Sequence, residues 1–219
     1  MLSGLLGLAI ALVGTGCTGS TPRSLARYDD LIWLPMSLEA QADSGDPEAQ
    51  HAMGLRCEQS LAEGEAAAWY RRAAEQGHPG AQNNLGLLYF TGRGVERDHA
   101  RALELYESAA RQNDPSGLAN LGIMHLFGHE VTQDRDRALQ LLEEAAVLGN
   151  HRAQYLTAVL LLERDPGGQP GLRTIGWLEE AAKNGIESAR RRLALLRNRA
   201  SETPAQLIDD GALACVDAD

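Results

Sequence analysis

Small and apolar residues in the middle of this chain recur with a period of 36 residues. Four alanine pairs mark the period: Ala73-Ala74, Ala109-Ala110, Ala145-Ala146 and Ala181-Ala182. A Gly or Asn follows every pair at the same distance, at Gly77, Asn113, Gly149 and Gly185. Self-similarity at a fixed period of this length is typical of repeat arrays. We therefore expect about four copies of one structural module.

The apolar positions within each module have the spacing of two helices. The first helix, helix A, is expected at 47–58, 79–91, 115–127 and 151–163, and the second, helix B, at 62–76, 98–112, 134–148 and 171–184. Aromatic residues make up only 5% of the chain, which favours helices packed through small side chains over a sheet. The predicted fold is an all-α solenoid, a superhelix of antiparallel helix pairs with capping helices.

Each boundary between modules carries the same helix-ending and helix-starting residues. Gly or Asn adopts the left-handed conformation that ends a helix, Asp or Asn caps the next helix, and Pro suits its first turn. The sequences are Gly45-Asp46-Pro47, Gly77-His78-Pro79, Asn113-Asp114-Pro115 and Gly149-Asn150-His151. Asp98 and Asp134 are expected to cap helix B in the second and third modules.

A glycine recurs in the middle of helix A, at Gly54, Gly86 and Gly122. A glycine inside a helix costs about 1 kcal/mol relative to alanine. Its recurrence therefore predicts a place where two helices approach closely, and we expect the alanine pairs of helix B to be the partners.

The first 16 residues carry no charged side chain, and the apolar run 2–13 is shorter than the roughly 20 residues that span a bilayer. Small residues follow this run directly before Cys17, so the segment resembles a bacterial lipoprotein signal in which Cys17 is lipidated. It departs from that pattern in lacking Lys or Arg before the run and in having Gly14 where an aliphatic residue is usual. An ordinary cleaved signal peptide and an uncleaved anchor stay open.

These observations divide the chain into nine segments. The apolar spacing of Leu31, Leu34, Leu38 and Ala42 predicts half a repeat at the N-terminal end, kinked at Pro35. The predicted segments are signal peptide 1–16, flexible tether 17–28, capping half-repeat 29–45, repeats 46–77, 78–113, 114–149 and 150–185, capping helix 186–199 and acidic tail 200–219.

The second module carries the pattern A-x-x-x-L-G-x-x-Y from Ala81 to Tyr89, followed by G-x-G-V-x-x-D from Gly92 to Asp98. Together with Trp69-Tyr70 or Leu105-Tyr106 before the alanine pairs, this resembles the Sel1-like repeat family, which is related to the tetratricopeptide repeats. The resemblance implies a right-handed superhelix that serves as a binding scaffold, and it implies no catalytic residue.

Charge and residue patterns exclude several other functions. The net charge of −10 disfavours binding to nucleic acid, which needs a basic surface. Glu143-Glu144 and Glu179-Glu180 occupy the same place in successive modules, as a solvated face does and a catalytic pair does not. His125 and His129 have a spacing that suits a metal on one helix face, but no third ligand is evident. We expect no metal, no cofactor and no catalytic residue.

The cysteines leave one alternative open. Cys57 lies in helix A of the first module and Cys215 lies in the acidic tail. Export would permit a disulfide between them, whereas a buried small apolar residue is the default interpretation of Cys57.

Residues that vary between modules on the concave side of helix A are the best candidates for partner contact: His51, Asn83, Phe90, Arg152, Tyr155 and Arg191. Leu55, Leu87, Ile123, Val159 and Leu195 recur at one position and are expected to pack between modules. The predicted function is a monomeric, non-enzymatic scaffold for a protein or peptide partner. Its lipid is expected to hold it in the bacterial cell envelope as a periplasmic lipoprotein anchored at the outer membrane. A regulator or accessory of a peptidoglycan or envelope enzyme, and a secreted effector-like protein, are the alternatives.

Overall fold

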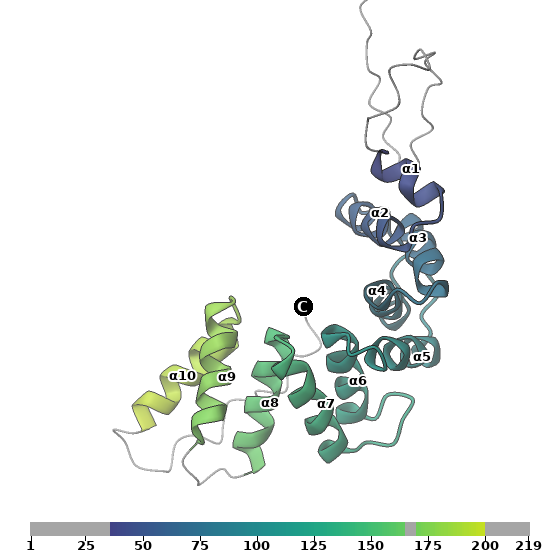
Figure 1. Ribbon diagram of the computed structural model, residues 1–219. Coiled ribbons are helices and arrows are strands. Elements are labelled where there is room, and N and C mark those ends of the chain that lie inside the picture. Colours follow the sequence, from purple (N-terminus) through teal and green to yellow (C-terminus); the bar gives the residue numbers. More distant parts are fainter. Residues whose placement is uncertain (1–35, 165–169, 200–219) are drawn as a thin grey trace, which may run out of the picture.

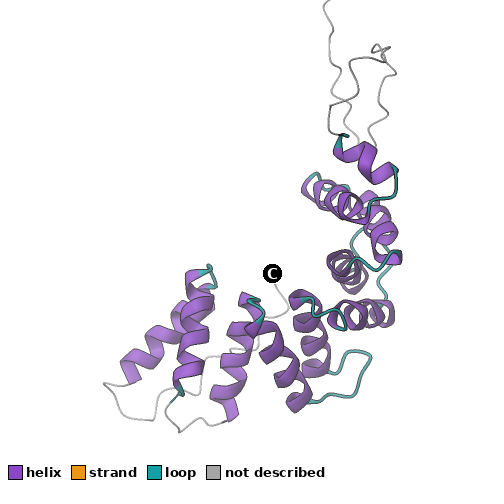
Figure 2. Cartoon of the chain, in the orientation of Figure 1, coloured by secondary structure: helices purple, strands orange, loops and turns teal. Residues whose placement is uncertain are grey.

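The computed structural model describes residues 36–164 and 170–199, and within these residues all regular structure is helical (Figure 2). The helices are α1 (Leu38–Asp43), α2 (Pro47–Gln59), α3 (Glu63–Glu75), α4 (Pro79–Thr91), α5 (His99–Ala110), α6 (Pro115–Phe127), α7 (Arg135–Val147), α8 (His151–Arg164), α9 (Leu172–Lys183) and α10 (Glu187–Arg199). The all-α prediction is confirmed, and every predicted helix A and helix B lies within two residues of its expected bounds.

The helices stack in chain order into a curved array (Figure 1). The most extensive contacts join the two helices of one module, α2 with α3, α4 with α5 and α6 with α7. Each helix B also packs against helix A of the next module, so the apolar core continues along the whole array. In Figure 1, α2 and α4 lie on the inner side of the curve, and α3 and α5 lie on the outer side.

The predicted helix ends are present. The side chain of Asp114 accepts a hydrogen bond from the backbone N–H of Gly117 at 2.6 Å, and Asp98 and Asp134 cap α5 and α7 in the same way. Asn113 has a φ of 58° between α5 and α6, which is the left-handed conformation that the turn requires. At the second boundary His78 replaces the acidic cap, and its Nδ1 atom accepts from the N–H of Ala81 at 3.1 Å.

The expected partners of the helix-A glycines are wrong. The glycines pack against larger side chains one turn before the alanine pairs, namely Tyr70 at Gly54, Tyr106 at Gly86 and Leu142 at Gly122. Each of these helix-B side chains lies over helix A of its own module and leaves no room for a Cβ atom at the glycine beneath it. The alanine side of helix B instead faces the next repeat, where an added Cβ on Gly117 would lie 2.6 Å from the Cβ of Ala109.

Buried glutamines join the modules, a feature that the sequence reasoning missed. The side-chain amide of Gln82 donates to the backbone oxygen of Ala74 at 3.3 Å, and Gln154 does the same to Ala146 at 3.2 Å. Gln112 then donates to Gln82 Oε1 at 2.9 Å. In the first two bonds, a glutamine of helix A donates to a backbone carbonyl group near the end of the preceding helix B, which has no partner within its own helix.

Some of the sequence predictions concern residues outside the described ranges. The signal segment, the tether, the kink at Pro35 and the acidic tail all lie there. Cys57 is completely buried in α2 and takes part in a disulfide, so it is not the free apolar residue of the default interpretation. The other two cysteines of the chain, Cys17 and Cys215, lie outside the described residues. None of the described helices combines the length and the apolar character that crossing a membrane demands.

Candidate partner-binding surface

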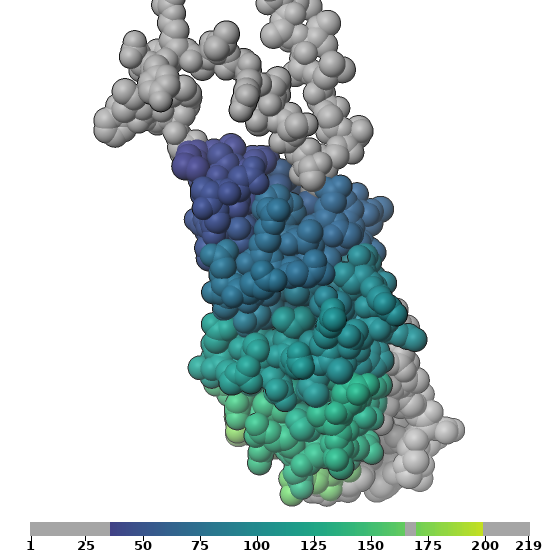
Figure 3. Space-filling view, turned by 90° about the vertical axis from the view of Figure 1, so that its right-hand side faces the viewer, coloured from purple at the N-terminus to yellow at the C-terminus, as the bar shows by residue number. Residues whose placement is uncertain are grey.

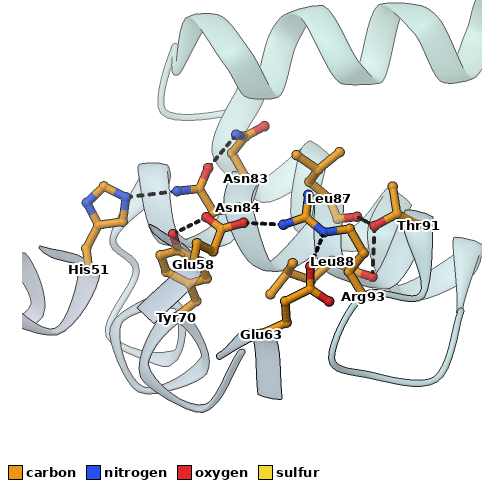
Figure 4. A network of polar contacts seen from close by, with 10 residues as sticks. All are labelled: His51, Glu58, Glu63, Tyr70, Asn83, Asn84, Leu87, Leu88, Thr91 and Arg93. Carbon is orange, nitrogen blue, oxygen red and sulfur yellow. Dashed lines mark hydrogen bonds and ion pairs between the residues drawn. The ribbon is translucent and has the colours of Figure 1, made fainter. Parts of the chain in front are cut away.

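A line of polar side chains crosses the helix-A face of the first three modules. The Asn84 amide donates to His51 Nε2 at 3.1 Å, and Asn83 donates to Asn84 Oδ1 at 3.1 Å (Figure 4). Asn120 on α6 continues the line by donating to Asn83 Oδ1 at 2.8 Å. We call these four residues the amide ladder. It links α2, α4 and α6 and leaves part of the hydrogen-bonding capacity of its half-buried members open, since an Asn side chain has two donors and an acceptor with two lone pairs.

A second network fixes the first two modules to each other (Figure 4). Arg93, in the loop after α4, donates to Glu58 Oε1 at 2.7 Å and to Glu63 Oε1 at 2.8 Å. The other oxygen of Glu58 accepts from the Tyr70 hydroxyl at 2.6 Å. Burial and the Glu58 carboxylate raise the pKa of Tyr70, because both disfavour the phenolate. The loop after α4 is therefore held against α2 and α3.

The structure brings some of the predicted contact residues together. His51 is half-buried and joins the ladder, whereas Asn83 is only 6% exposed and has both ends of its amide bonded. Asn83 therefore positions its neighbours and offers little surface of its own. Arg152 and Arg191 are exposed, on α8 and α10, and Tyr155 is half-buried against the apolar core.

Phe90 lies in a different cluster from the other predicted contact residues. Its ring stacks on His99 at the start of α5, with 4.7 Å between the ring centroids. His129, in the loop after α6, meets both rings edge-on, at 5.4 Å from Phe90 and 5.8 Å from His99. This cluster joins α4 and α5 of the second module to the loop after α6 in the third.

Recurring aliphatic residues behave only partly as expected. Ile123 and Val159 are 8% and 2% exposed, which confirms a packing role, but Leu55 is 40% exposed. Leu87 and Leu195, at the same repeat position, are half-buried.

The structure places His125 and His129 in different surroundings. The ring of His129 lies against Phe90 and His99, and His125 Nδ1 is buried without a hydrogen-bond partner among the described residues. The carboxylates of Glu144, Glu179 and Glu180 are exposed, as a solvated face requires.

Another cluster, Glu48, His51 and His78, brings three possible metal ligands within 4.8 Å of one another. However, His78 Nδ1 accepts a backbone N–H, so the proton of this ring is on Nε2, where it donates to Glu48 at 2.9 Å. A metal on Nε2 of a neutral ring would place the proton on Nδ1 and break the helix cap. The cluster is thus arranged as a cap that ties α4 to α2. Burial and the neighbouring His78 lower the pKa of His51, which is neutral at pH 7.

The Sel1 repeat matches four successive segments, residues 47–78, 79–114, 115–150 and 151–186, which together cover more than half of the chain. The chain belongs to the Sel1 repeat family. Each matched segment contains one helix A and the helix B that follows it.

Solved structures of other Sel1 repeat proteins are similar to this one. A Sel1 repeat protein from Oxalobacter formigenes has 31% sequence identity and a TM-score of 0.66, and the match covers 77% of this chain and 71% of that one. A putative Sel1 repeat protein from Klebsiella pneumoniae has 19% identity and a TM-score of 0.38, over 73% of this chain and 97% of that one. No significant match to a curated protein is found.

Proposed function

We propose that this Sel1 repeat protein is a non-enzymatic interaction scaffold of the bacterial cell envelope that binds a protein or peptide along its helix-A face. The observation that carries the proposal is the amide ladder, because side-chain amides on a rigid helix face offer donors and acceptors that match peptide groups. Sel1 repeat proteins are typically protein-interaction scaffolds, which supports this function.

Exposed residues further along the array extend this face. Arg152 and Arg191 lie on helix A of the fourth module and on the closing helix, and neither is held in a buried network. Exposed arginines with few fixed contacts are well suited to bind a partner, because their guanidinium groups present several donors. A partner that reaches from the ladder to α10 would contact every module.

Photo-crosslinking in isolated envelopes tests where a partner binds. A photoreactive residue at position 152 or 191 is expected to capture a discrete protein, and the same residue at position 111 is not. Arg111 is a matched control because it is also exposed but lies at the end of helix B. Capture from position 111 alone would refute the helix-A site.

Affinity for the captured protein tests the contact itself. The double variant Arg152→Ala/Arg191→Ala is expected to bind it more weakly, while Arg111→Ala/Arg137→Ala, which removes two exposed arginines from helix B, keeps its affinity. Unchanged binding by the first variant, with an unchanged helical circular dichroism spectrum, would move the site to another face.

The envelope location is part of the proposal and rests on Cys17 and the apolar run before it. We expect the mature chain to begin at a lipidated Cys17, and several acyl chains would give a stable anchor where one alone gives marginal binding. Mass spectrometry of the mature N-terminus checks this. A mature chain that begins after Cys17, or a Cys17→Ser variant that stays in the membrane fraction, would contradict it.

A further inference from the structure

A polar cavity lies outside the helix-A face, between the first and second modules. Its volume is about 400 Å³, which lies within the range of small-ligand sites. Its walls come from α3, α4, α5 and the loop before α5, and they are formed by Arg71, Tyr89, Val95, Glu96, Arg97, Asp98 and Arg101. The helices α3 and α5 lie on the outer side of the array, which Figure 3 turns toward the viewer.

Two arginines converge on one hydroxyl group in this cavity. Arg101 Nη1 donates to the Tyr89 hydroxyl at 3.2 Å, and Arg71 Nη2 approaches it at 3.4 Å. The ring of Tyr89 is only 7% exposed, so its hydroxyl is held at the cavity floor. These hydrogen bonds, that from Arg71 first, lower the pKa of Tyr89. The hydroxyl proton finds no acceptor among the described residues, so it is available to a ligand.

The positive charge at Arg71 is specific to this module. The residues 36, 72 and 108 positions later are Glu107, Glu143 and Glu179. In the described part of the chain Arg71 has no carboxylate within ion-pair distance, although the protein carries a net charge of −10. The Arg71 side chain is therefore a candidate for binding the anionic group of a ligand.

The loop that forms one wall is rigidly placed. Arg93 ties it to Glu58 and Glu63, and an added Cβ on Gly94 would overlap the backbone of Glu63. Gly94 has a φ of 66°, a conformation that favours glycine. The arginines on either side of the cavity therefore face a preformed space.

We propose that this cavity, which we call the outer pocket, binds a carboxylate group through Arg71, Arg101 and the Tyr89 hydroxyl. Guanidinium groups match the planar fork of a carboxylate, and a phenol donates to one of its oxygens. The charges decide between a carboxylate and a phosphate. Three arginines, Glu96 and Asp98 line the pocket, and Arg101 Nε is paired with Asp98 Oδ2 at 3.2 Å, so the lining carries a net charge of +1. One carboxylate neutralises this charge, whereas a doubly charged phosphate exceeds it. This site lies beyond the proposed helix-A function and does not depend on it.

Nuclear magnetic resonance of the arginine side chains tests the pocket. Acetate, added at constant ionic strength against chloride, is expected to shift the Nε–H signals of Arg71 and Arg101 in a saturable way, while acetamide shifts neither. The variants Arg71→Glu, which restores the residue type of the later modules, and Tyr89→Phe are each expected to weaken acetate binding about tenfold or more.

Arg137→Gln is the matched control, because Arg137 occupies the repeat position of Arg101 in the next module. In that module the position of Arg71 is occupied by Glu107, so the pair of arginines is missing. This variant should bind acetate as the parent protein does, and so should Arg152→Ala/Arg191→Ala. Shifts that do not saturate, or that survive Arg71→Glu, would overturn the proposal. Inorganic phosphate binding more tightly than acetate would overturn the choice of a carboxylate.

Two peptides identify the source of the carboxylate. Acetyl-trialanine with a free C-terminus presents a chain end, and acetyl-Ala-Glu-Ala-amide presents an acidic side chain. Tighter binding than acetate by one of them supports that source. Failure of both to compete with acetate would refute a protein carboxylate as the ligand.

Discussion

Replacing Gly54 by alanine tests how closely the helices of one module approach. Gly54 lies in the middle of α2 under the ring of Tyr70, which is completely buried. An alanine Cβ would lie 2.9 Å from Tyr70 Cζ and closer still to two other ring carbons, although ordinary contact begins at 3.4 Å. The ring has little freedom to move, because its hydroxyl is bonded to Glu58.

Two opposing effects set the change in the free energy of unfolding that Gly54→Ala causes. Alanine improves the helix by about 1 kcal/mol relative to glycine. Overpacking a well-filled core costs about 1–3 kcal/mol, and the overlap with a fixed ring places Gly54→Ala near the upper end. The net loss of stability is therefore expected to be about 2 kcal/mol.

Gly176 in α9 is the matched control, since it is also inside a helix but has no atom within 4 Å of an added Cβ. Gly176→Ala should gain about 1 kcal/mol from helix propensity alone. Urea unfolding followed by circular dichroism, with hydrogen exchange to localise the change in this repeat array, measures both variants. A Gly54→Ala protein as stable as Gly176→Ala would show that the close approach does not constrain the fold.

Three further predictions concern caps and titrating groups. Asp114→Ala should lower stability by about 1 kcal/mol by removing the α6 cap, and an unchanged melting temperature would contradict this. His51 should titrate below 6.5 by nuclear magnetic resonance. Because its pKa is depressed in the folded state, the unfolded chain binds more protons below pH 6.5, so stability should fall as the pH drops from 6.5 through the folded pKa. In an ultraviolet pH titration, Tyr89→Phe should remove a phenol that ionises below pH 10, whereas Tyr70 should ionise above it; the reverse order would refute the arginine contacts.

Interactions between distant residues account for most of what the sequence reasoning missed. The capping role of His78 was hidden because histidine is an uncommon helix cap, and only the position of its Nδ1 reveals it. Asn84 and Asn120 join through partners 33 and 37 residues away, a separation that no local pattern encodes. Phe90 was grouped with His51 by helical offset alone, yet the loop after α6 draws it to His129.

Sequence by itself determined the helices, their order and the repeat of about 36 residues, because caps, left-handed turn positions and apolar spacing are local properties read within one or two turns. It also placed the chain in its family through short motifs that repeat. Tertiary structure alone decided which side of helix B faces which neighbour. It also decided that Arg71 and Arg101 meet at Tyr89, because these contacts depend on how one module is rotated against the next.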